Sequence, residues 1–300
     1  MNTLDIVRLV DLVTAEVLEA LARTGPATCR CHATLVDCCP QRVGPIVEAG
    51  ATRLSLYAAG ASADLASFID HTMLKPDATQ DDVEGLCREA REAGFATVCV
   101  NPTWVSLAAV RLQGSAVGVC SVVGFPLGAT TADVKRYEAE GAIFDGASEV
   151  DMVINVGALK SGDMTTVQDD VSRVVEVCRR RGVASKVIIE AALLTREEKV
   201  RACQVARQAG ATFVKTSTGF GPGGATIDDV VLMRETVGPA MGIKAAGGIK
   251  TYAAAKALIS AGATRIGASA SVRIVEESRA RAAAADRVAD SSVRASRRDR

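Results

Sequence analysis

Residues 186–217 read KVIIEAALLTREEKVRACQVARQAGATFVKTS and contain the unit that decides the fold. An apolar run, Lys186–Ala191, precedes a segment of helical periodicity, Arg196–Gln208, and a second apolar run, Thr212–Ser217, follows it. Ala209-Gly210 lies between the helical segment and the second apolar run, and glycine supplies the left-handed residue that ends a helix. The order predicts two parallel strands joined by a helix.

The same unit repeats from about Leu65 onward. Eight apolar runs are predicted strands: Ala66–Asp70, Ala96–Val100, Val117–Val123, Glu149–Asn155, Lys186–Ala191, Thr212–Ser217, Gly242–Ala246 and Thr264–Gly267. Helical periodicity between them covers Asp81–Glu92, Thr131–Phe144, Thr165–Arg181, Arg196–Gln208, Ile227–Thr236 and Tyr252–Ser260. Eight such units fit a small TIM barrel, whereas an open doubly wound sheet usually has fewer strands. We therefore predict a (β/α)8 TIM barrel over residues 64–277.

Two segments flank the predicted barrel. Residues 1–63 form an N-terminal extension with one strongly periodic helix, Leu4–Ala22, followed by a stretch that contains cysteine and proline. Residues 278–300 are rich in alanine and arginine and lack the apolar density to pack, so we expect this tail to fray.

The composition favours a protein with a small-molecule substrate. The 35 basic residues balance the 35 acidic ones, so no global charge would attract nucleic acid or an anionic membrane. Neither a long apolar run nor a secretion signal is evident, and the expected compartment is the cytoplasm. We expect five cysteines within the predicted barrel to be buried, reduced thiols because they stand singly among apolar residues: Cys87, Cys99, Cys120, Cys178 and Cys203.

Three charged residues interrupt apolar strands where a barrel active site would form. Lys215 lies in Phe213–Ser217, Lys244 precedes Ala245-Ala246-Gly247-Gly248, and Asp151 lies in Glu149–Asn155. Because strand side chains alternate between faces, Lys215 and Asp151 can point into the barrel. A structural Lys215–Asp151 ion pair is one interpretation, but it leaves Lys244 as an unpaired cation. The surplus positive charge favours a neutral amine on one lysine, which is the form that attacks a carbonyl.

Glycine-rich turns follow the last strands. Gly247-Gly248 follows the seventh strand, Gly267-Ala268-Ser269 the eighth, and Thr218-Gly219 the sixth. Many barrels bind phosphate at the seventh and eighth positions through backbone N–H groups. Barrels also need glycine in ordinary loops. However, these glycine turns lie beside the strands that contain Lys215 and Lys244, which favours a phosphorylated substrate.

Five motifs, in this order and spacing, make residues 65–275 resemble the deoxyribose-phosphate aldolase family. They are Ile69–Thr79 (IDHTMLKPDAT), Val123–Gly128 (VGFPLG), Glu149–Leu159 (EVDMVINVGAL), Lys215–Phe220 (KTSTGF) and Lys244–Ile249 (KAAGGI). The resemblance implies that Lys215 forms a Schiff base, that Lys244 perturbs its ionisation, and that Asp151 transfers protons through a water. It also implies that Asp70, Thr72, Cys99 and Thr218 are pocket residues. By the same resemblance, Gly219, Gly248 and Ser269 contact the phosphate.

The implied reaction is the reversible cleavage of 2-deoxyribose 5-phosphate to glyceraldehyde 3-phosphate and acetaldehyde. The sequence departs from the family at two points. Ala270 stands where some members have a second phosphate-binding serine, and no tyrosine follows Tyr252, so a C-terminal tyrosine proton shuttle is not expected. The alternatives to this function are another lysine aldolase, a phosphate-binding barrel isomerase and a non-catalytic assembly scaffold.

No metal or other cofactor is expected. His71 is the only histidine of the predicted barrel, and a catalytic zinc usually needs three protein ligands. In the extension, Cys29, Cys31, His32, Cys38 and Cys39 fit zinc-ligand spacing poorly. A small packed lobe with thiols is the preferred interpretation of that cluster over a metal site.

The helix at residues 4–22 has an apolar stripe, formed by Val7, Val10, Val13, Thr14, Val17, Leu18 and Leu21. The stripe predicts packing on the barrel or on a partner subunit, or docking to another protein. It resembles the short targeting helices of enzymes in bacterial microcompartments, so shell proteins are a candidate partner. A homo-oligomer of the aldolase is also expected.

Overall fold

The computed structural model describes residues 64–283 as a closed barrel of eight parallel strands. Each strand pairs with the next along the chain, and the eighth pairs with the first. The strands are β1 (Ile69–Met73), β2 (Thr97–Val100), β3 (Gly118–Val123), β4 (Glu149–Val153), β5 (Ala184–Ile188), β6 (Phe213–Lys215), β7 (Gly242–Ala246) and β8 (Arg265–Ala268). The predicted TIM barrel is confirmed.

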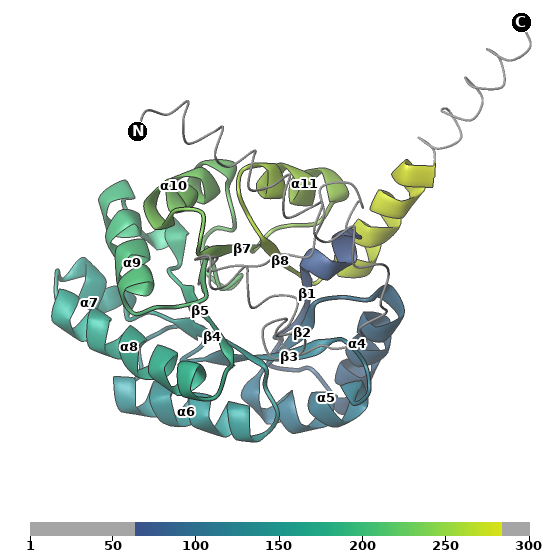
Figure 1. Ribbon diagram of the computed structural model, residues 1–300, viewed down its shortest axis with the longest axis horizontal. Helices are drawn as coiled ribbons and strands as arrows, with labels where there is room; N and C mark the ends of the chain where they lie inside the picture. The colour runs from purple at the N-terminus through teal and green to yellow at the C-terminus, as the bar shows by residue number, and fades with distance from the viewer. Residues whose placement is uncertain (1–63, 284–300) are drawn as a thin grey trace, which may run out of the picture. The chain divides into compact units, whose positions relative to one another are not determined.

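Helices surround the strands, as Figure 1 shows. They are α4 (Gln80–Ala93), α5 (Val105–Leu112), α6 (Ala132–Phe144), α7 (Val156–Lys160), α8 (Met164–Arg180), α9 (Arg196–Gln208), α10 (Ile227–Val237), α11 (Tyr252–Ser260) and a C-terminal helix of residues 271–283. Within residues 64–283, none of these helices is both long and apolar enough to span a bilayer.

Local sequence signals set several helix ends. Thr79 is the N-cap of α4 and Thr195 that of α9, each with a complete capping box, in which the threonine and the third helical residue satisfy each other's free backbone groups. At the other end, Gly210 adopts φ 79°, the left-handed conformation predicted for this Ala-Gly stop, and Gly94 ends α4 in the same way with φ 75°.

The apolar core lies between the strands and the helices. Outward-facing residues such as Val150, Met152 and Val187 are completely buried under the helix ring. The alternate residues point into the barrel and many are charged: Asp151 pairs in register with Lys186, and Lys215 pairs with Lys244. The strand period of two thus separates an apolar outer core from a polar interior.

The strand boundaries differ most from the prediction at β1 and β5. Residues Leu65–Phe68 form a 3-10 helix, capped by Asp64, so β1 begins and ends three residues later than expected. β5 ends at Ile188 rather than at residue 191, because Glu190 adopts a left-handed backbone and a 3-10 helix follows at Ala191–Leu193.

The predicted tail begins too early. The C-terminal helix continues through residue 283, and Arg279 pairs with Asp64 at 2.6 Å and donates to the carbonyl oxygen of Ala93 at 3.0 Å. Residues 278–283 are therefore helical. The predicted N-terminal helix, the cysteine cluster of the extension and residues 284–300 lie outside the described residues. The five barrel cysteines are buried free thiols, as predicted.

Candidate active site

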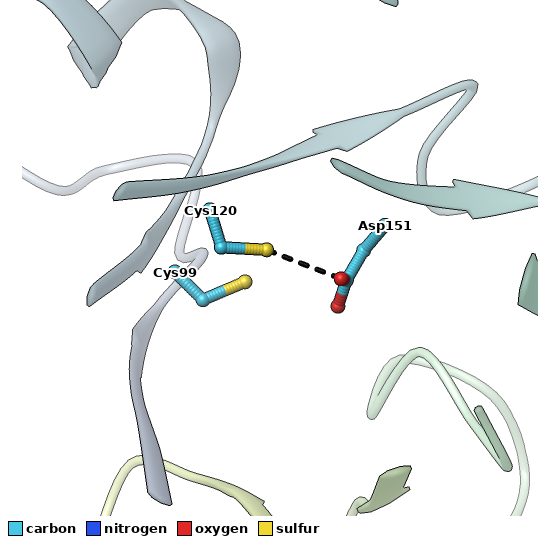
Figure 2. A group of neighbouring side chains, drawn as sticks. All are labelled: Cys99, Cys120 and Asp151. Atoms are coloured by element: carbon cyan, nitrogen blue, oxygen red, sulfur yellow. Dashed lines mark hydrogen bonds between the residues drawn. The ribbon is translucent and has the colours of Figure 1, made fainter. Parts of the chain in front are cut away.

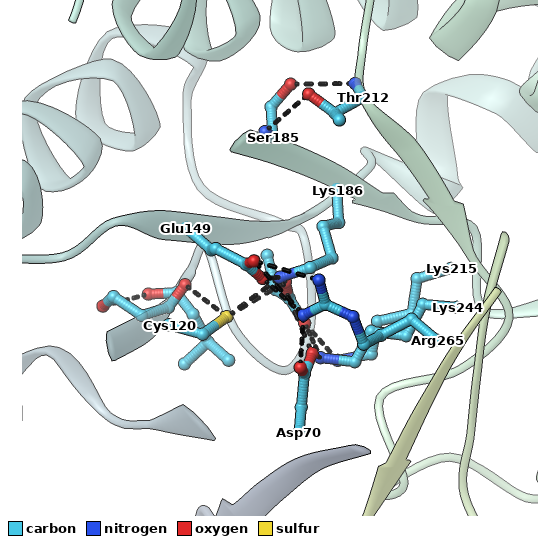
Figure 3. A network of polar contacts seen from close by, with 12 residues as sticks. Asp70, Cys120, Glu149, Ser185, Lys186, Thr212, Lys215, Lys244 and Arg265 are labelled. Atoms are coloured by element: carbon cyan, nitrogen blue, oxygen red, sulfur yellow. Dashed lines mark hydrogen bonds and ion pairs between the residues drawn. The ribbon is translucent and has the colours of Figure 1, made fainter. Parts of the chain in front are cut away.

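Lys215, Lys244 and Asp151 meet inside the barrel. Figure 3 shows Lys215 and Lys244 within the polar network that surrounds them. Lys215 ends β6, and Lys244 is its register partner on β7. Both ammonium nitrogens contact the same carboxylate oxygen, Oδ2 of Asp151, at 2.8 Å from Lys215 and 2.7 Å from Lys244. The structure thus brings together the three residues predicted to carry the chemistry.

Lys244 is paired, so the prediction that it is an unpaired cation is wrong. Besides Asp151, Lys244 contacts Asp70 Oδ2 at 2.5 Å. Four further charged residues share the interior: Asp70, Glu149, Lys186 and Arg265. Arg265 contacts Asp70 at 2.5 Å and Glu149 at 3.0 Å, while Lys186 contacts Glu149 at 2.5 Å and Asp151 at 2.7 Å.

The interior network still has a surplus of positive charge. Within the described residues it joins four basic side chains (Lys186, Lys215, Lys244 and Arg265) to three carboxylates (Asp70, Glu149 and Asp151). A buried charge without a counter-charge is costly, and a lysine can avoid that cost by releasing its proton. The surplus charge therefore still favours one neutral amine, although the ion-pair partners differ from those predicted.

Ion pairing controls the protonation of the groups around Lys215. Burial alone would raise the pKa of Asp151, but Lys186, Lys215 and Lys244 outweigh it and hold the pKa well below its usual range. Burial alone would lower the pKa of Lys244, but Asp151 and Asp70 outweigh it and raise the pKa. Ion pairing thus favours the charged forms of both Asp151 and Lys244.

A cavity of about 420 Å³ opens above this network. The loops after β1, β6, β7 and β8 line it, through Thr72, Met73, Leu74, Lys75, Lys215, Thr218, Gly219, Phe220, Ala246, Gly247, Gly248, Ile249, Lys250, Gly267, Ala268 and Ser269. Of the interior lysines, Lys215 lines the cavity, whereas Lys186 and Lys244 lie beneath it. A carbonyl compound in the cavity would therefore meet the Lys215 amine.

Glycine residues shape one end of the cavity. Gly219, Gly247 and Gly248 have φ of 87°, 91° and 74°, a conformation that side chains disfavour. Gly224 packs so closely on this turn that an added Cβ would lie 2.2 Å from the carbonyl oxygen of Gly247. Lys250 lines the same cavity, and its charge suits a phosphate.

Cys99 and Cys120 lie beside Asp151, as Figure 2 shows. They are register partners on β2 and β3, and the Cys120 thiol donates to Asp151 Oδ1 at 3.1 Å. Two thiols and a carboxylate within 4.8 Å of one another have the geometry of metal ligands. However, the ammonium group of Lys186 lies 3.3 Å from Cys120 Sγ and 2.7 Å from Asp151 Oδ1, so it occupies the place that a cation would take.

The comparisons with known proteins agree with this geometry. The family model for DeoC/LacD family aldolases matches residues 65–276. A deoxyribose-phosphate aldolase of Streptococcus gordonii is 59% identical over 212 residues, which cover 71% of this chain and 96% of that protein. One of Streptococcus pneumoniae serotype 19F is 62% identical over the same length and the same shares of both chains. The chain belongs to the deoxyribose-phosphate aldolase family.

A solved structure extends this likeness to three dimensions. The deoxyribose-phosphate aldolase of Aeropyrum pernix, described as a unique tetramer, superposes with a TM-score of 0.68 at 36% identity, covering 72% of this chain and 91% of that one. Members of the family are aldolases, which make and break carbon–carbon bonds. The matched region coincides with the barrel, so residues 1–64 lie outside the family match.

The aldolase site places the remaining predicted residues in two groups. Like Lys215, seven of them line the cavity: Thr72, Thr218, Gly219, Gly247, Gly248, Gly267 and Ser269. Asp70 and Cys99, expected in the pocket, lie completely buried beneath its wall. Asp70 is instead a counter-ion of Lys244. Gly267 also gives Lys244 its space, since an added Cβ would lie 2.9 Å from Lys244 Cε.

Sequence reasoning missed the deeper part of this aldolase site. Glu149 could have been found, because it precedes Asp151 by two residues and strand alternation puts both on one face. Lys186 and Arg265 stand at the starts of predicted strands, where a charge usually marks solvent. Their inward position follows only from closure of the barrel.

Proposed function

We propose that this chain catalyses the reversible cleavage of 2-deoxyribose 5-phosphate to glyceraldehyde 3-phosphate and acetaldehyde. One observation carries the proposal: Lys215 lines a glycine-rich cavity while its neighbours, Lys244 and Asp151, form an ion-pair network below it. The names of the relatives at about 60% identity support the same substrate.

The reaction begins at the amine of Lys215. The neutral amine adds to the aldehyde carbon of the open-chain sugar, and loss of water gives an iminium. A base then removes the proton of the 3-hydroxyl, and the bond between C2 and C3 breaks. Its electron pair enters the iminium, which leaves an enamine on Lys215 and releases glyceraldehyde 3-phosphate.

Protonation of the enamine carbon and hydrolysis of the new iminium release acetaldehyde and restore the amine. Asp151 lies beneath the cavity, so it would exchange protons with the substrate through a water. Lys244 stays charged because of Asp70 and Asp151, and this cation favours the neutral form of the adjacent amine.

The phosphate would bind at the glycine-lined end of the cavity. Gly219, Gly247 and Gly248 let the substrate approach the backbone closely, and Ser269 stands two residues before the C-terminal helix. The ammonium group of Lys250 would add a counter-charge.

The test is turnover of 2-deoxyribose 5-phosphate by the purified chain, with glyceraldehyde 3-phosphate measured by a coupled dehydrogenase. We expect turnover by the wild type and by Lys256→Met, which removes an exposed lysine of α11. Lys215→Met should be inactive. A wild type that leaves this sugar intact but cleaves or isomerises another phosphosugar contradicts the proposal.

We propose self-association through the outer face of α6. Val134, Tyr137 and Phe144 follow one side of this helix and are 51%, 74% and 93% exposed. Such an apolar surface is typical of a protein interface, and the Aeropyrum pernix relative is described as a tetramer. Sedimentation should show an oligomer that Phe144→Lys shifts toward monomer, whereas an unchanged mass would place the interface elsewhere.

We also propose that residues 4–22 dock to microcompartment shell proteins. The apolar stripe of this segment and its position outside the family match support a role separate from catalysis. A shell would retain acetaldehyde, which is volatile and reactive. Deletion of residues 1–23 should leave kcat/KM nearly unchanged, and residues 1–23 fused to a reporter should direct it to shell proteins. A destabilised barrel or a diffuse reporter would assign the helix a structural role.

A further inference from the structure

Glu190 is a buried glutamate in an unfavourable backbone conformation. Its φ of 51° makes it the one non-glycine residue with positive φ within residues 64–283. It follows β5 at the edge of the barrel where the cavity opens, and its side chain is buried. Strained residues of this kind persist where surrounding contacts hold them, often beside functional sites.

The contacts of the Glu190 carboxylate converge on one cavity loop. Oε2 accepts hydrogen bonds from both the backbone N–H of Thr218, at 3.2 Å, and the Thr218 hydroxyl. The same hydroxyl oxygen accepts the N–H of Phe220 at 3.0 Å. A charged acceptor forms stronger bonds than a neutral one, so the carboxylate fixes the turn that contains Thr218, Gly219 and Phe220.

The other carboxylate oxygen packs against Gly221. Oε1 is buried and has no hydrogen-bond partner within the described part of the chain. A Cβ added at Gly221 would lie 2.9 Å from both Cδ and Oε1 of Glu190. Residues 218–221, which we call the carboxylate loop, therefore enclose this side chain from two sides.

The carboxylate loop forms a wall of the cavity. Thr218, Gly219 and Phe220 all line it. A Cβ added at Gly247 would lie 3.6 Å from the Cα of Gly219, which places Gly219 at the glycine-lined end where the phosphate would bind. The Phe220 ring meets Phe125 edge-on, with centroids 5.4 Å apart, so this turn also aligns the two rings.

We infer that Glu190 is a positioning residue for phosphate recognition, acting through the carboxylate loop. The inference rests on the proposed function, because it assigns the phosphate to the Gly219 end of the cavity. The left-handed backbone at Glu190 turns the carboxylate under the loop, and Gly221 leaves the space for it. Within residues 64–283 the Glu190 carboxylate makes no hydrogen bond or ion pair with Lys215, so Schiff-base chemistry should not require it.

The experiment is a double-mutant cycle between Glu190→Gly and Gly221→Ala. Glycine suits the left-handed backbone and removes the carboxylate, while alanine at residue 221 pushes the carboxylate away. Each single variant should raise KM for 2-deoxyribose 5-phosphate about tenfold and change KM for unphosphorylated deoxyribose less than about twofold. Because both act through one contact, the double variant should be no worse than Glu190→Gly alone.

Glu190→Gln is the conservative variant, since its amide oxygen can still accept from Thr218. It should recover KM to within about threefold of the wild type. Equal KM changes for the two sugars, additive effects in the double variant, or an unchanged KM in Glu190→Gly would each overturn the inference. If Glu190→Gly fails to fold, Gly221→Ala and Glu190→Gln still provide the KM comparison. Wild-type turnover tests the proposed function separately and does not depend on these variants.

Discussion

Lys215 and Lys244 donate to one and the same atom, Oδ2 of Asp151, from register-paired positions on β6 and β7. Two ammonium groups on one oxygen repel each other, so the arrangement favours loss of one proton. Lys244 has Asp70 as a second counter-ion, whereas Lys215 lines the cavity. Lys215 is therefore the amine that can be neutral and reach a substrate.

Removal of Lys244 should shift the pH dependence of the reaction. In Lys244→Leu the interior keeps three basic groups for three carboxylates, so the surplus positive charge that favours a neutral amine is gone. We expect the rate of Schiff-base formation at pH 7 to fall by about tenfold or more, and to recover as pH rises, since each pH unit changes the amine fraction about tenfold. Pre-steady-state rates between pH 6 and pH 10 measure this, and a loss that is equal at every pH would assign Lys244 another role.

A negative charge at residue 269 should weaken phosphate binding. Ser269 lines the cavity, so Ser269→Asp places a carboxylate beside the proposed phosphate position. KM for 2-deoxyribose 5-phosphate should rise about tenfold or more, while KM for deoxyribose changes little. Ser269→Asn introduces a side chain of the same size as aspartate but without charge. It is the control and should raise this KM less than Ser269→Asp does. Similar losses for both sugars would place the phosphate elsewhere.

Activity should survive exhaustive chelation. The electron sink of the proposed reaction is an iminium on Lys215, so the chemistry needs no metal ion. The ammonium group of Lys186 already contacts Asp151 and Cys120, where a metal ion would otherwise bind. Dialysis against EDTA, with metal content measured before and after, should leave kcat unchanged. Loss of activity that a divalent ion restores would contradict the Schiff-base assignment.

His71 should make the fold less stable in mild acid. Burial lowers the pKa of His71 and outweighs the opposing effect of Glu89, whose carboxylate contacts Nε2 at 2.7 Å. Between this lowered pKa and the value of about 6.5 for an unfolded histidine, the unfolded chain binds more protons. The contribution of His71 to stability is therefore present above about pH 6.5 and is lost as pH falls toward the folded-state pKa.

Denaturant unfolding of the wild type and of His71→Gln between pH 5 and pH 7.5 isolates this contribution. The free energy of unfolding should rise more steeply with pH in the wild type. Glu89→Gln removes the carboxylate that raises the pKa of His71, so the free energy of unfolding should rise still more steeply with pH in this variant. Identical slopes in the wild type and His71→Gln would show that His71 does not titrate differently on folding.

Much of the fold could be predicted because its signals are local. Ala-Gly stops end α4 and α9, and an apolar run follows each, so strand and helix alternate visibly along the chain. The boundary at Glu190 could not be predicted: a glutamate in a left-handed conformation is held by Thr218 and Gly221, which are distant in sequence.

The candidate site could be predicted in part for the same reason. Alternation along the strand predicts that Asp151 and Lys215 face inward, and the structure agrees. The second counter-ion of Lys244 is Asp70, on a strand that is far away in sequence, and Arg265 links that carboxylate to Glu149. These contacts depend on β8 closing against β1, which no local pattern records.

The most direct test of Lys215 as the nucleophile is borohydride reduction in the presence of acetaldehyde, followed by peptide mass mapping. Hydride should fix the iminium, so one two-carbon adduct is expected on the peptide that contains Lys215, and none on that containing Lys244. Lys215→Ala should remain folded by circular dichroism, lose turnover and take up no label, while Lys256→Ala should behave as the wild type. An adduct on Lys244, or undiminished labelling of Lys215→Ala, would contradict the account.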